Sequence, residues 1–166
     1  MREIFERRSI RKYTDAVVPD ELIEKLLMAA MAAPSAGNQQ PWEFVVIRDR
    51  KVMEGIIEFH PYAQMLDEAP LAISVCADLN RETHKGYWMI DCAAATENIL
   101  LEAQHLGLGA VWLGIYPRTE RVAGLKALLN LPENVMPLCV ISIGYPAEKK
   151  NPSNRFDSSR IHRDRW

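Results

Sequence analysis

Four basic residues fall within seven positions near the start of the chain, in the segment Arg7–Tyr13 (RRSIRKY). Ser9 lies inside this run. An Arg guanidinium presents a planar fork of donors and a Ser hydroxyl adds one short hydrogen bond, so these residue types together can bind a phosphate. A solvated surface run is the commoner meaning of such a cluster. The pattern alone leaves both interpretations open.

The rest of the chain argues against nucleic acid as the bound anion. Its 166 residues include 20 Lys and Arg and 22 Asp and Glu, for a formal net charge of -2, and no basic stripe with interleaved aromatic residues recurs. With 48% hydrophobic residues the chain resembles an ordinary globular domain, and we expect one domain over residues 1–166. It has no apolar run of about twenty residues and no signal-peptide pattern, which predicts a cytoplasmic protein without membrane association.

The cysteines and histidines do not suggest a metal site. Cys76, Cys92 and Cys139 lie in apolar stretches without CxxC spacing, which predicts reduced thiols in the core. The four histidines are scattered, with no HExxH motif and no Cys/His pair at ligand spacing. We therefore expect no metal.

A second segment with binding potential is the loop Pro34–Trp42 (PSAGNQQPW), which is dense in hydroxyl and amide side chains. A plain connection between a helix and a strand could be shorter. The loop is either a polar surface turn or a set of donors and acceptors for a ring with several heteroatoms.

The glycines of Gly107–Gly114 (GLGAVWLG) superficially match a dinucleotide-binding fingerprint. In that fingerprint the glycines follow a strand and open a helix. Here they precede a predicted strand, and Trp112 occupies the position of the third glycine. We reject this interpretation.

Two long helices must position these segments. The stretch Pro19–Ala33 has Pro and acidic residues at its start and apolar residues at helical spacing. The stretch Trp88–Leu106 is apolar almost all round, which is typical of a helix buried in a core or in a subunit interface, and Gly107 is its expected C-cap. Asp91, Glu97 and Asn98 interrupt it, and we expect them to make structural hydrogen bonds.

Short β-branched stretches predict four strands, and a further helix lies between the last two. The strands are expected at residues 43–49, 71–78, 110–116 and 136–145, and the helix at 119–130. A short helix is plausible at residues 1–6, and the polar tail 149–166 is expected to be extended. This order of elements predicts layers of helices on a sheet.

Taken in order, several of these segments resemble the nitroreductase family of FMN-dependent oxidoreductases. The matching segments are RRSIRKY, AAPSAGNQQPWEFVVI, DCAAATENILLEAQHLGLGAVWLG and ISIGYPAE, followed by a late Arg and RIHRDRW. The resemblance covers nearly the whole chain. It implies an α+β fold with a mixed, mainly antiparallel sheet flanked by helices, and an intertwined homodimer with FMN at the subunit interface and NAD(P)H as reductant.

The resemblance also assigns candidate FMN contacts residue by residue. Arg7, Arg8 and Ser9 match the segment that holds the phosphate and ribityl chain, Arg11 the basic residue near flavin N1 and O2, and Arg155 a late basic residue on the phosphate. The strand end that faces the ring near N5 is matched by Trp112, Leu113 and Gly114. The loop that reaches FMN from the other subunit is matched by Pro34, Ser35, Ala36, Asn38 and Gln40. Two positions depart from longer relatives, which often have basic residues where this chain has Ser153 and Gln64.

The chemistry implied by the resemblance requires no catalytic triad, because a flavin carries the electrons and the protein supplies orientation and electrostatics. Arg11 would stabilise the negative charge of the reduced flavin; without the resemblance, a salt bridge to Asp15 would be the preferred role for it. The expected reaction passes a hydride or electrons from NAD(P)H through FMN to an electron-poor small-molecule acceptor such as a nitroaromatic or a quinone. Alternatives are a specialised family member that dehalogenates its substrate or fragments its flavin, and a non-enzymatic FMN-binding module.

Overall fold

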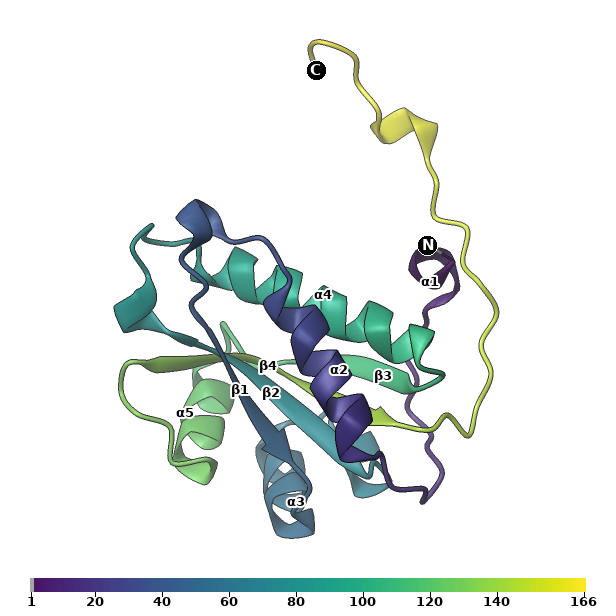
Figure 1. Ribbon diagram of the computed structural model, residues 1–166, viewed down its shortest axis with the longest axis vertical. Coiled ribbons are helices and arrows are strands. Elements are labelled where there is room, and N and C mark those ends of the chain that lie inside the picture. The colour runs from purple at the N-terminus through teal and green to yellow at the C-terminus, as the bar shows by residue number, and fades with distance from the viewer. Residues whose placement is uncertain (1) are drawn as a thin grey trace.

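A four-stranded sheet lies at the centre of the molecule, between two helices on one face and two on the other (Figure 1). The structure is a computed structural model that describes residues 2–166. The strands are β1 (Trp42–Ile47), β2 (Leu71–Asp78), β3 (Gly109–Gly114) and β4 (Val135–Gly144), arranged in the order β1-β2-β4-β3. Every neighbouring pair in this sheet is antiparallel. A parallel bridge between Ser9 and Ala110 adds the N-terminal segment beside β3.

The helices and short turns alternate with the strands along the chain. The α-helices are α1 (Glu3–Glu6), α2 (Asp20–Met31), α3 (Arg50–Phe59), α4 (Trp88–His105) and α5 (Thr119–Leu128). Four 3-10 turns are η1 (Ala36–Asn38), η2 (Gln64–Asp67), η3 (Leu79–Arg81) and η4 (Ser158–Arg160).

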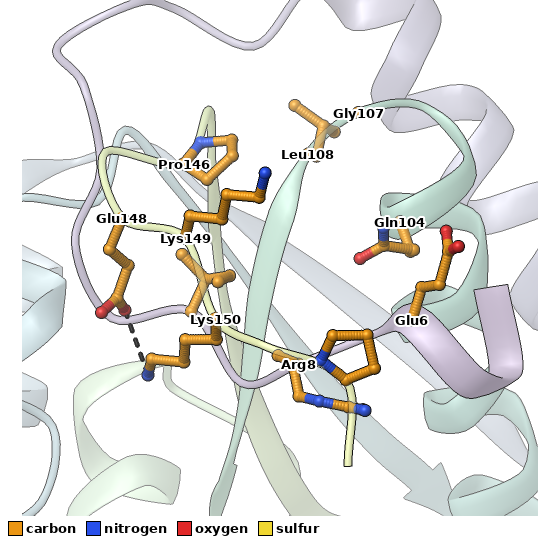
Figure 2. A pocket seen from close by; sticks show the side chains of 11 residues that line it. Glu6, Arg8, Gln104, Gly107, Leu108, Pro146, Glu148, Lys149 and Lys150 are labelled. Atoms are coloured by element: carbon orange, nitrogen blue, oxygen red, sulfur yellow. Dashed lines mark ion pairs between the residues drawn. The ribbon is translucent and has the colours of Figure 1, made fainter. Parts of the chain in front are cut away.

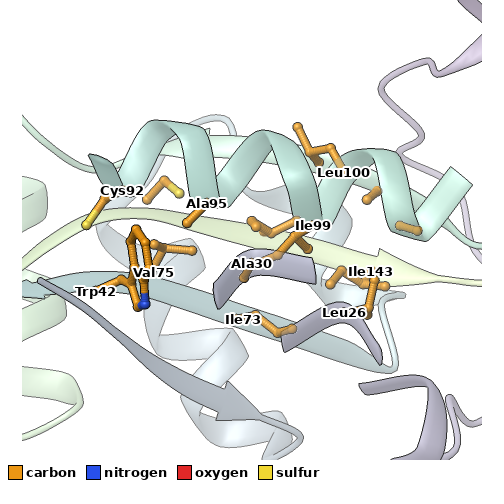
Figure 3. Packing of buried hydrophobic residues seen from close by; sticks show 14 of the residues in the cluster. Leu26, Ala30, Trp42, Ile73, Val75, Cys92, Ala95, Ile99, Leu100 and Ile143 are labelled. Carbon is orange, nitrogen blue, oxygen red and sulfur yellow. The ribbon is translucent and has the colours of Figure 1, made fainter. Parts of the chain in front are cut away.

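The core has two parts, one on each face of the sheet. On the first face, α2 and α4 pack on the strands through side chains such as Leu26, Ile73 and Ile99, all fully buried (Figure 3). On the second face, α3 and α5 bury Ile56 and Leu125 against the sheet. Burial of this apolar surface drives the assembly of the layers.

The helix α3 was not predicted from the sequence. Asp49 caps its N-terminus, since the Asp49 carboxylate accepts a hydrogen bond from the backbone N–H of Lys51. Gly55 lies in the middle of the helix, where glycine lowers helix propensity. A Cβ at this position would stand 2.9 Å from Leu128 Cδ1, so the glycine permits close packing of α3 on α5.

The helix α4 follows the expectation closely, because it runs from Trp88 to His105 and Gly107 just beyond it has a φ of +74°. Its N-terminus is capped by Glu82, whose carboxylate accepts hydrogen bonds from the backbone N–H groups of Gly86 and Trp88. Asn98 donates to the carbonyl of Ala29 on α2, which confirms its structural role.

The three cysteines are free and buried, as predicted for core thiols. Burial raises the pKa of Cys76 to about 11, so this thiol stays protonated at neutral pH.

The tail leaves the body of the molecule as an extended segment (Figure 1). Residues 149–166 are all exposed, and η4 is their one helical turn. The expectation of a polar, extended tail is confirmed. Within residues 2–166, every helix is too short or too polar to cross a membrane.

Candidate functional site

The basic N-terminal segment is fixed along the free edge of β3. The backbone N–H of Ile10 donates to the carbonyl of Ala110 at 3.1 Å. Tyr13 anchors the segment further, because its hydroxyl lies 2.7 Å from the carbonyl of Ile10 and 3.2 Å from that of Ser142. Gly109 leaves room for this approach, since a Cβ there would stand 2.6 Å from Ile10 Cγ2.

Arg7 is held against α4 but retains donor capacity. Its Nε lies 3.4 Å from Oε1 of Glu97, close enough for an ion pair. That Nε is nevertheless buried without a hydrogen bond. The two Nη groups of Arg7 make no hydrogen bond or ion pair within residues 2–166, so they are the donors of this side chain that remain for an anionic ligand.

Arg8 lies on a different side of the segment from Arg11. Its guanidinium donates to the carbonyls of Phe5 and Asn151 at 2.8 and 2.9 Å, and to that of Arg7. It lines a cavity of about 370 Å³ together with Lys149 and Lys150, which follow β4 (Figure 2). Most of the Arg8 donors are therefore already satisfied by the chain itself.

The two lysines of this cavity were not singled out from the sequence. Lys150 Nζ lies 3.2 Å from Glu148 Oε1 and donates to the carbonyl of Ser9 at 2.7 Å (Figure 2). Glu148 also accepts a hydrogen bond from the backbone N–H of Arg11 at 2.6 Å, and this bond, followed by Lys150, lowers the Glu148 pKa below its ordinary value. This network ties the segment after β4 to the N-terminal segment.

A second cavity, of about 450 Å³, brings together four of the predicted contacts: Arg11, Trp112, Leu113 and Gly114. The Arg11 guanidinium makes no hydrogen bond or ion pair within residues 2–166, so the alternative salt bridge to Asp15 is not formed. Gly114 leaves the wall open, because a Cβ there would have no heavy atom within 4 Å. We call this space the Arg11 cavity.

Five further residues line the Arg11 cavity: Gln64, which the sequence analysis noted as a departure from longer relatives, and His60, Tyr62, Met65 and Arg121, which were missed from the sequence. His60 Nε2 lies 3.0 Å from the carbonyl oxygen of Gly114, and Arg121 Nη1 donates to the same oxygen at 2.8 Å. Burial and then the nearby positive charge of Arg121 lower the pKa of His60 below its ordinary value of 6.5. A neutral imidazole that donates through Nε2 fits this arrangement.

The loop between α2 and β1 is held by Asp91, near the start of α4. The buried carboxylate of Asp91 accepts hydrogen bonds from the backbone N–H of Ala36 at 2.9 Å and from Nε2 of Gln39 at 2.6 Å. Asn38 and Gln40 have positive φ angles of 57° and 46°. These bonds confirm a structural role for Asp91 and fix an uncommon backbone conformation that presents the polar side chains of the loop.

The loop and the basic segment lie toward different ends of α4 (Figure 1). Asp91 holds the loop, whereas Arg7 of the basic segment lies beside Glu97, six residues further along the helix. At a rise of 1.5 Å per residue these two positions on α4 are about 9 Å apart. Within residues 2–166, no hydrogen bond, ion pair or shared cavity joins the predicted contacts Pro34, Ser35, Ala36, Asn38 and Gln40 to the Arg7–Arg11 segment.

Arg155 is also apart from the other predicted contacts. It lies in the exposed tail and has no hydrogen bond or ion pair within residues 2–166. Two hydrogen bonds join the start of the tail to the basic segment: Lys150 donates to the carbonyl of Ser9, and Arg8 donates to the carbonyl of Asn151.

Comparisons with known proteins agree on one family. The family model named Nitroreductase family matches residues 4–60 and 56–145. A protein of Methanothermobacter thermautotrophicus, provisionally named NADH dehydrogenase/NAD(P)H nitroreductase, is 52% identical over 160 residues, which cover 96% of this chain and 84% of that protein.

Solved structures give the same result. A crystal structure provisionally named an NADH oxidase, from Clostridium acetobutylicum, has a TM-score of 0.95 and 52% identity and covers 99% of both chains. An FMN-dependent nitroreductase from Clostridium difficile has a TM-score of 0.91 and 32% identity, covering 99% of this chain and 98% of that one.

Proposed function

Because the chain belongs to the nitroreductase family, we propose that it is an FMN-dependent oxidoreductase, which passes electrons from NAD(P)H to an electron-poor acceptor such as a nitroaromatic or a quinone. When bound, FMN supplies the redox chemistry that no side chain of the chain offers. One observation carries this proposal: the unpaired Arg11 guanidinium faces the same cavity as the open backbone at Gly114.

The residues present fit the cofactor. A flavin ring needs a flat space beside exposed backbone, and the missing side chain at Gly114 leaves such a space. Its phosphate needs donors, and the two Nη groups of Arg7 make no hydrogen bond or ion pair within residues 2–166. Ser9, between Arg7 and Arg11, adds a hydroxyl on the same segment. The set thus combines phosphate donors and a ring site.

Each of these residues has a distinct role in the proposal. Arg7 and Ser9 bind the phosphate and ribityl chain, while Arg11 places a positive charge where the reduced ring becomes negative. Trp112 and Leu113 wall the ring site, and Gly114 keeps it open. The carbonyl of Gly114 is held in place by His60 and Arg121, so the strand end does not rearrange when a ligand enters.

The complete site requires a second copy of the chain in this proposal. The polar loop Ser35–Gln40 shares no cavity, hydrogen bond or ion pair with the Arg7–Arg11 segment of its own chain within residues 2–166, and a homodimer would let it reach the partner's flavin. Apolar side chains available for such an interface are exposed, including Ile90 on α4, which is 63% exposed, and Met28 on α2, which is 66% exposed. The extended tail that carries Arg155 could likewise contact a partner (Figure 1).

The short connection from β2 to α4 supports an open site that takes electron-poor acceptors of more than one kind. Only η3 and a short loop separate Asp78 from Trp88, so no long helical lid covers the site from this connection. We further propose that residues 1–166 form one FMN-binding domain and that the protein acts in the cytoplasm.

Analysis of the flavin released on denaturation tests the cofactor. Purified protein should be yellow and release FMN, because the phosphate donors suit a terminal phosphate. Release of FAD, or a colourless protein that ignores added FMN, would contradict the proposal. Steady NAD(P)H oxidation in the presence of a quinone would then distinguish an enzyme from a non-enzymatic FMN-binding protein.

A further inference from the structure

The Arg11 cavity carries an excess of positive charge. Two guanidinium groups, those of Arg11 and Arg121, line it, and no Asp or Glu side chain does. His60, the third basic group on its wall, has a pKa below its ordinary value. The neutral form of His60 leaves two cations in a partly enclosed space, where water screens charges poorly.

Arg121 is anchored through one end of its guanidinium. Nη1 donates to the carbonyl of Gly114 at 2.8 Å and lies 3.3 Å from Nε2 of His60. Tyr62 packs against the group, with 5.8 Å between the guanidinium carbon and the ring centroid. The side chain is therefore fixed before any ligand arrives, which lowers the entropy lost on binding.

The rest of the Arg121 guanidinium is available for a ligand. Within residues 2–166, neither its Nε nor its Nη2 makes a hydrogen bond, and no carboxylate lies within ion-pair distance. Glu120 and Arg118 line a neighbouring cavity, to which Arg121 also contributes, and neither of the two lines the Arg11 cavity. An anchored guanidinium with free donors suits a planar carboxylate or a similar oxyanion.

The charges do not balance without a further anion. A reduced flavin ring that carries one negative charge would compensate Arg11. The loop that a partner would contribute, residues 34–40, contains no charged side chain. One positive charge, that of Arg121, would then remain beside the space where the second substrate binds.

We propose that Arg121 recognises an anionic substituent, such as a carboxylate or sulfonate, on the electron-poor aromatic compound that accepts the electrons. The inference rests on the proposed function, since it places the acceptor beside a flavin in the Arg11 cavity. It narrows the acceptor from electron-poor aromatic compounds in general to those with an anionic group. Arg121 also positions the Gly114 carbonyl, and the test must separate that structural role from ligand recognition.

The test compares two ligands of nearly the same shape, 4-nitrobenzoate and 4-nitrobenzamide, by calorimetric titration of the oxidised holoprotein. Wild-type protein should bind the anion about tenfold more tightly than the amide, as expected for a charge-assisted hydrogen bond. Arg121→Gln should abolish this preference. The matched control Arg118→Gln, which removes a charge one cavity away, should retain it.

Several results would overturn the inference. Equal affinities for the two ligands in wild-type protein, no binding of either, or a preference that survives Arg121→Gln would each do so. An equal loss of affinity for both ligands in Arg121→Gln would assign the residue a purely structural role. If Arg121→Gln fails to fold, equal affinities of wild-type protein for 4-nitrobenzoate and 4-nitrobenzamide would still overturn the inference. If the purified protein binds no FMN, the proposed function is contradicted. The preference of Arg121 for an anionic ligand is then still measured, because the same two ligands are titrated into that protein.

Discussion

Arg7 and Arg8 are neighbours in the sequence, but their guanidinium groups have different surroundings. Arg8 donates to three backbone carbonyls and faces the cavity with Lys149 and Lys150. Within residues 2–166, the Arg7 Nε lies beside Glu97 and its two Nη groups make no hydrogen bond or ion pair. At the scale of single residues, Arg7 is therefore the better candidate for a phosphate contact made by a side chain.

Replacing Arg7 tests this difference. Arg7→Ala should weaken FMN binding by roughly tenfold or more, because a charge-assisted hydrogen bond to phosphate is lost. Arg118→Ala removes the same charge from an exposed position at the start of α5 and should leave affinity nearly unchanged. Fluorescence titration of apoprotein with FMN measures both. Equal FMN affinities of Arg7→Ala and Arg118→Ala would indicate that the basic segment is a solvated surface run without a role in phosphate binding.

His60 makes the stability of the protein depend on pH. Its pKa in the folded chain is below the ordinary value of 6.5, so the unfolded chain binds the proton first as the pH falls. Stability should therefore be unaffected by His60 well above pH 6.5 and decline as the pH falls below about 6.5.

Thermal melts across this pH range provide the measurement. His60→Gln, which can still donate to the Gly114 carbonyl, should show a smaller loss of Tm on acidification than wild-type protein does. His162→Gln, in the exposed tail, should behave like wild type. Parallel curves for wild type and His60→Gln would show that protonation of His60 does not limit stability.

At the scale of elements, β3 begins and ends with glycines that serve different purposes. A methyl group at Gly109 would stand 2.6 Å from Ile10 Cγ2, so this glycine lets the basic segment dock on the strand. At Gly114, which lines the Arg11 cavity, the same group would meet nothing within 4 Å. Gly109 is thus needed for packing against Ile10, and Gly114 is needed for the proposed flavin site.

The variants Gly109→Ala and Gly114→Ala should separate these two purposes. The first should lower the free energy of unfolding by about 1–3 kcal/mol through overpacking. The second should change it by less than about 0.5 kcal/mol, yet weaken FMN binding, because the methyl group narrows the ring site. Urea unfolding and FMN titration measure the two quantities. Normal FMN affinity in Gly114→Ala would show that the ring lies elsewhere.

Most elements could be predicted from the sequence because their patterns are local. The nearly continuous apolar run of α4 and that of β2 each indicate burial directly. The helix α3 was missed although its local signals are present, since Asp49 caps it and Met53 and Ile56 are buried at helical spacing. What the sequence does not show is the reason for Gly55, which is contact with Leu128 on α5, seventy-three positions away.

The site shows the same limit of sequence reasoning. Arg11 and Gly114 could be placed together through the family resemblance. His60 and Arg121 could not, because they are separated by sixty-one positions and meet only through the packing of α3 on α5. No local pattern marks either residue, and only the fold shows that both reach the Gly114 carbonyl.

At the scale of the whole molecule, the proposed site is shared between two chains. A mixed dimer of Arg7→Ala and Asn38→Ala chains would contain one intact site and one doubly damaged site. Each variant alone should be impaired at both sites, and the purified mixed dimer should recover about half of the wild-type activity per dimer. Measured FMN content should follow activity. An apo monomer that binds FMN stoichiometrically at full affinity would contradict the shared site.

The central claim is that the bound flavin exchanges electrons with both a nicotinamide nucleotide and an acceptor. Anaerobic mixing of the yellow protein with NADH or NADPH, followed by one equivalent of a quinone, tests it most directly in a stopped-flow absorbance experiment. At least one nucleotide should bleach the bound FMN, and the quinone should restore the yellow colour. Bound flavin that stays oxidised with both nucleotides, or that stays reduced after the quinone is added, would contradict it.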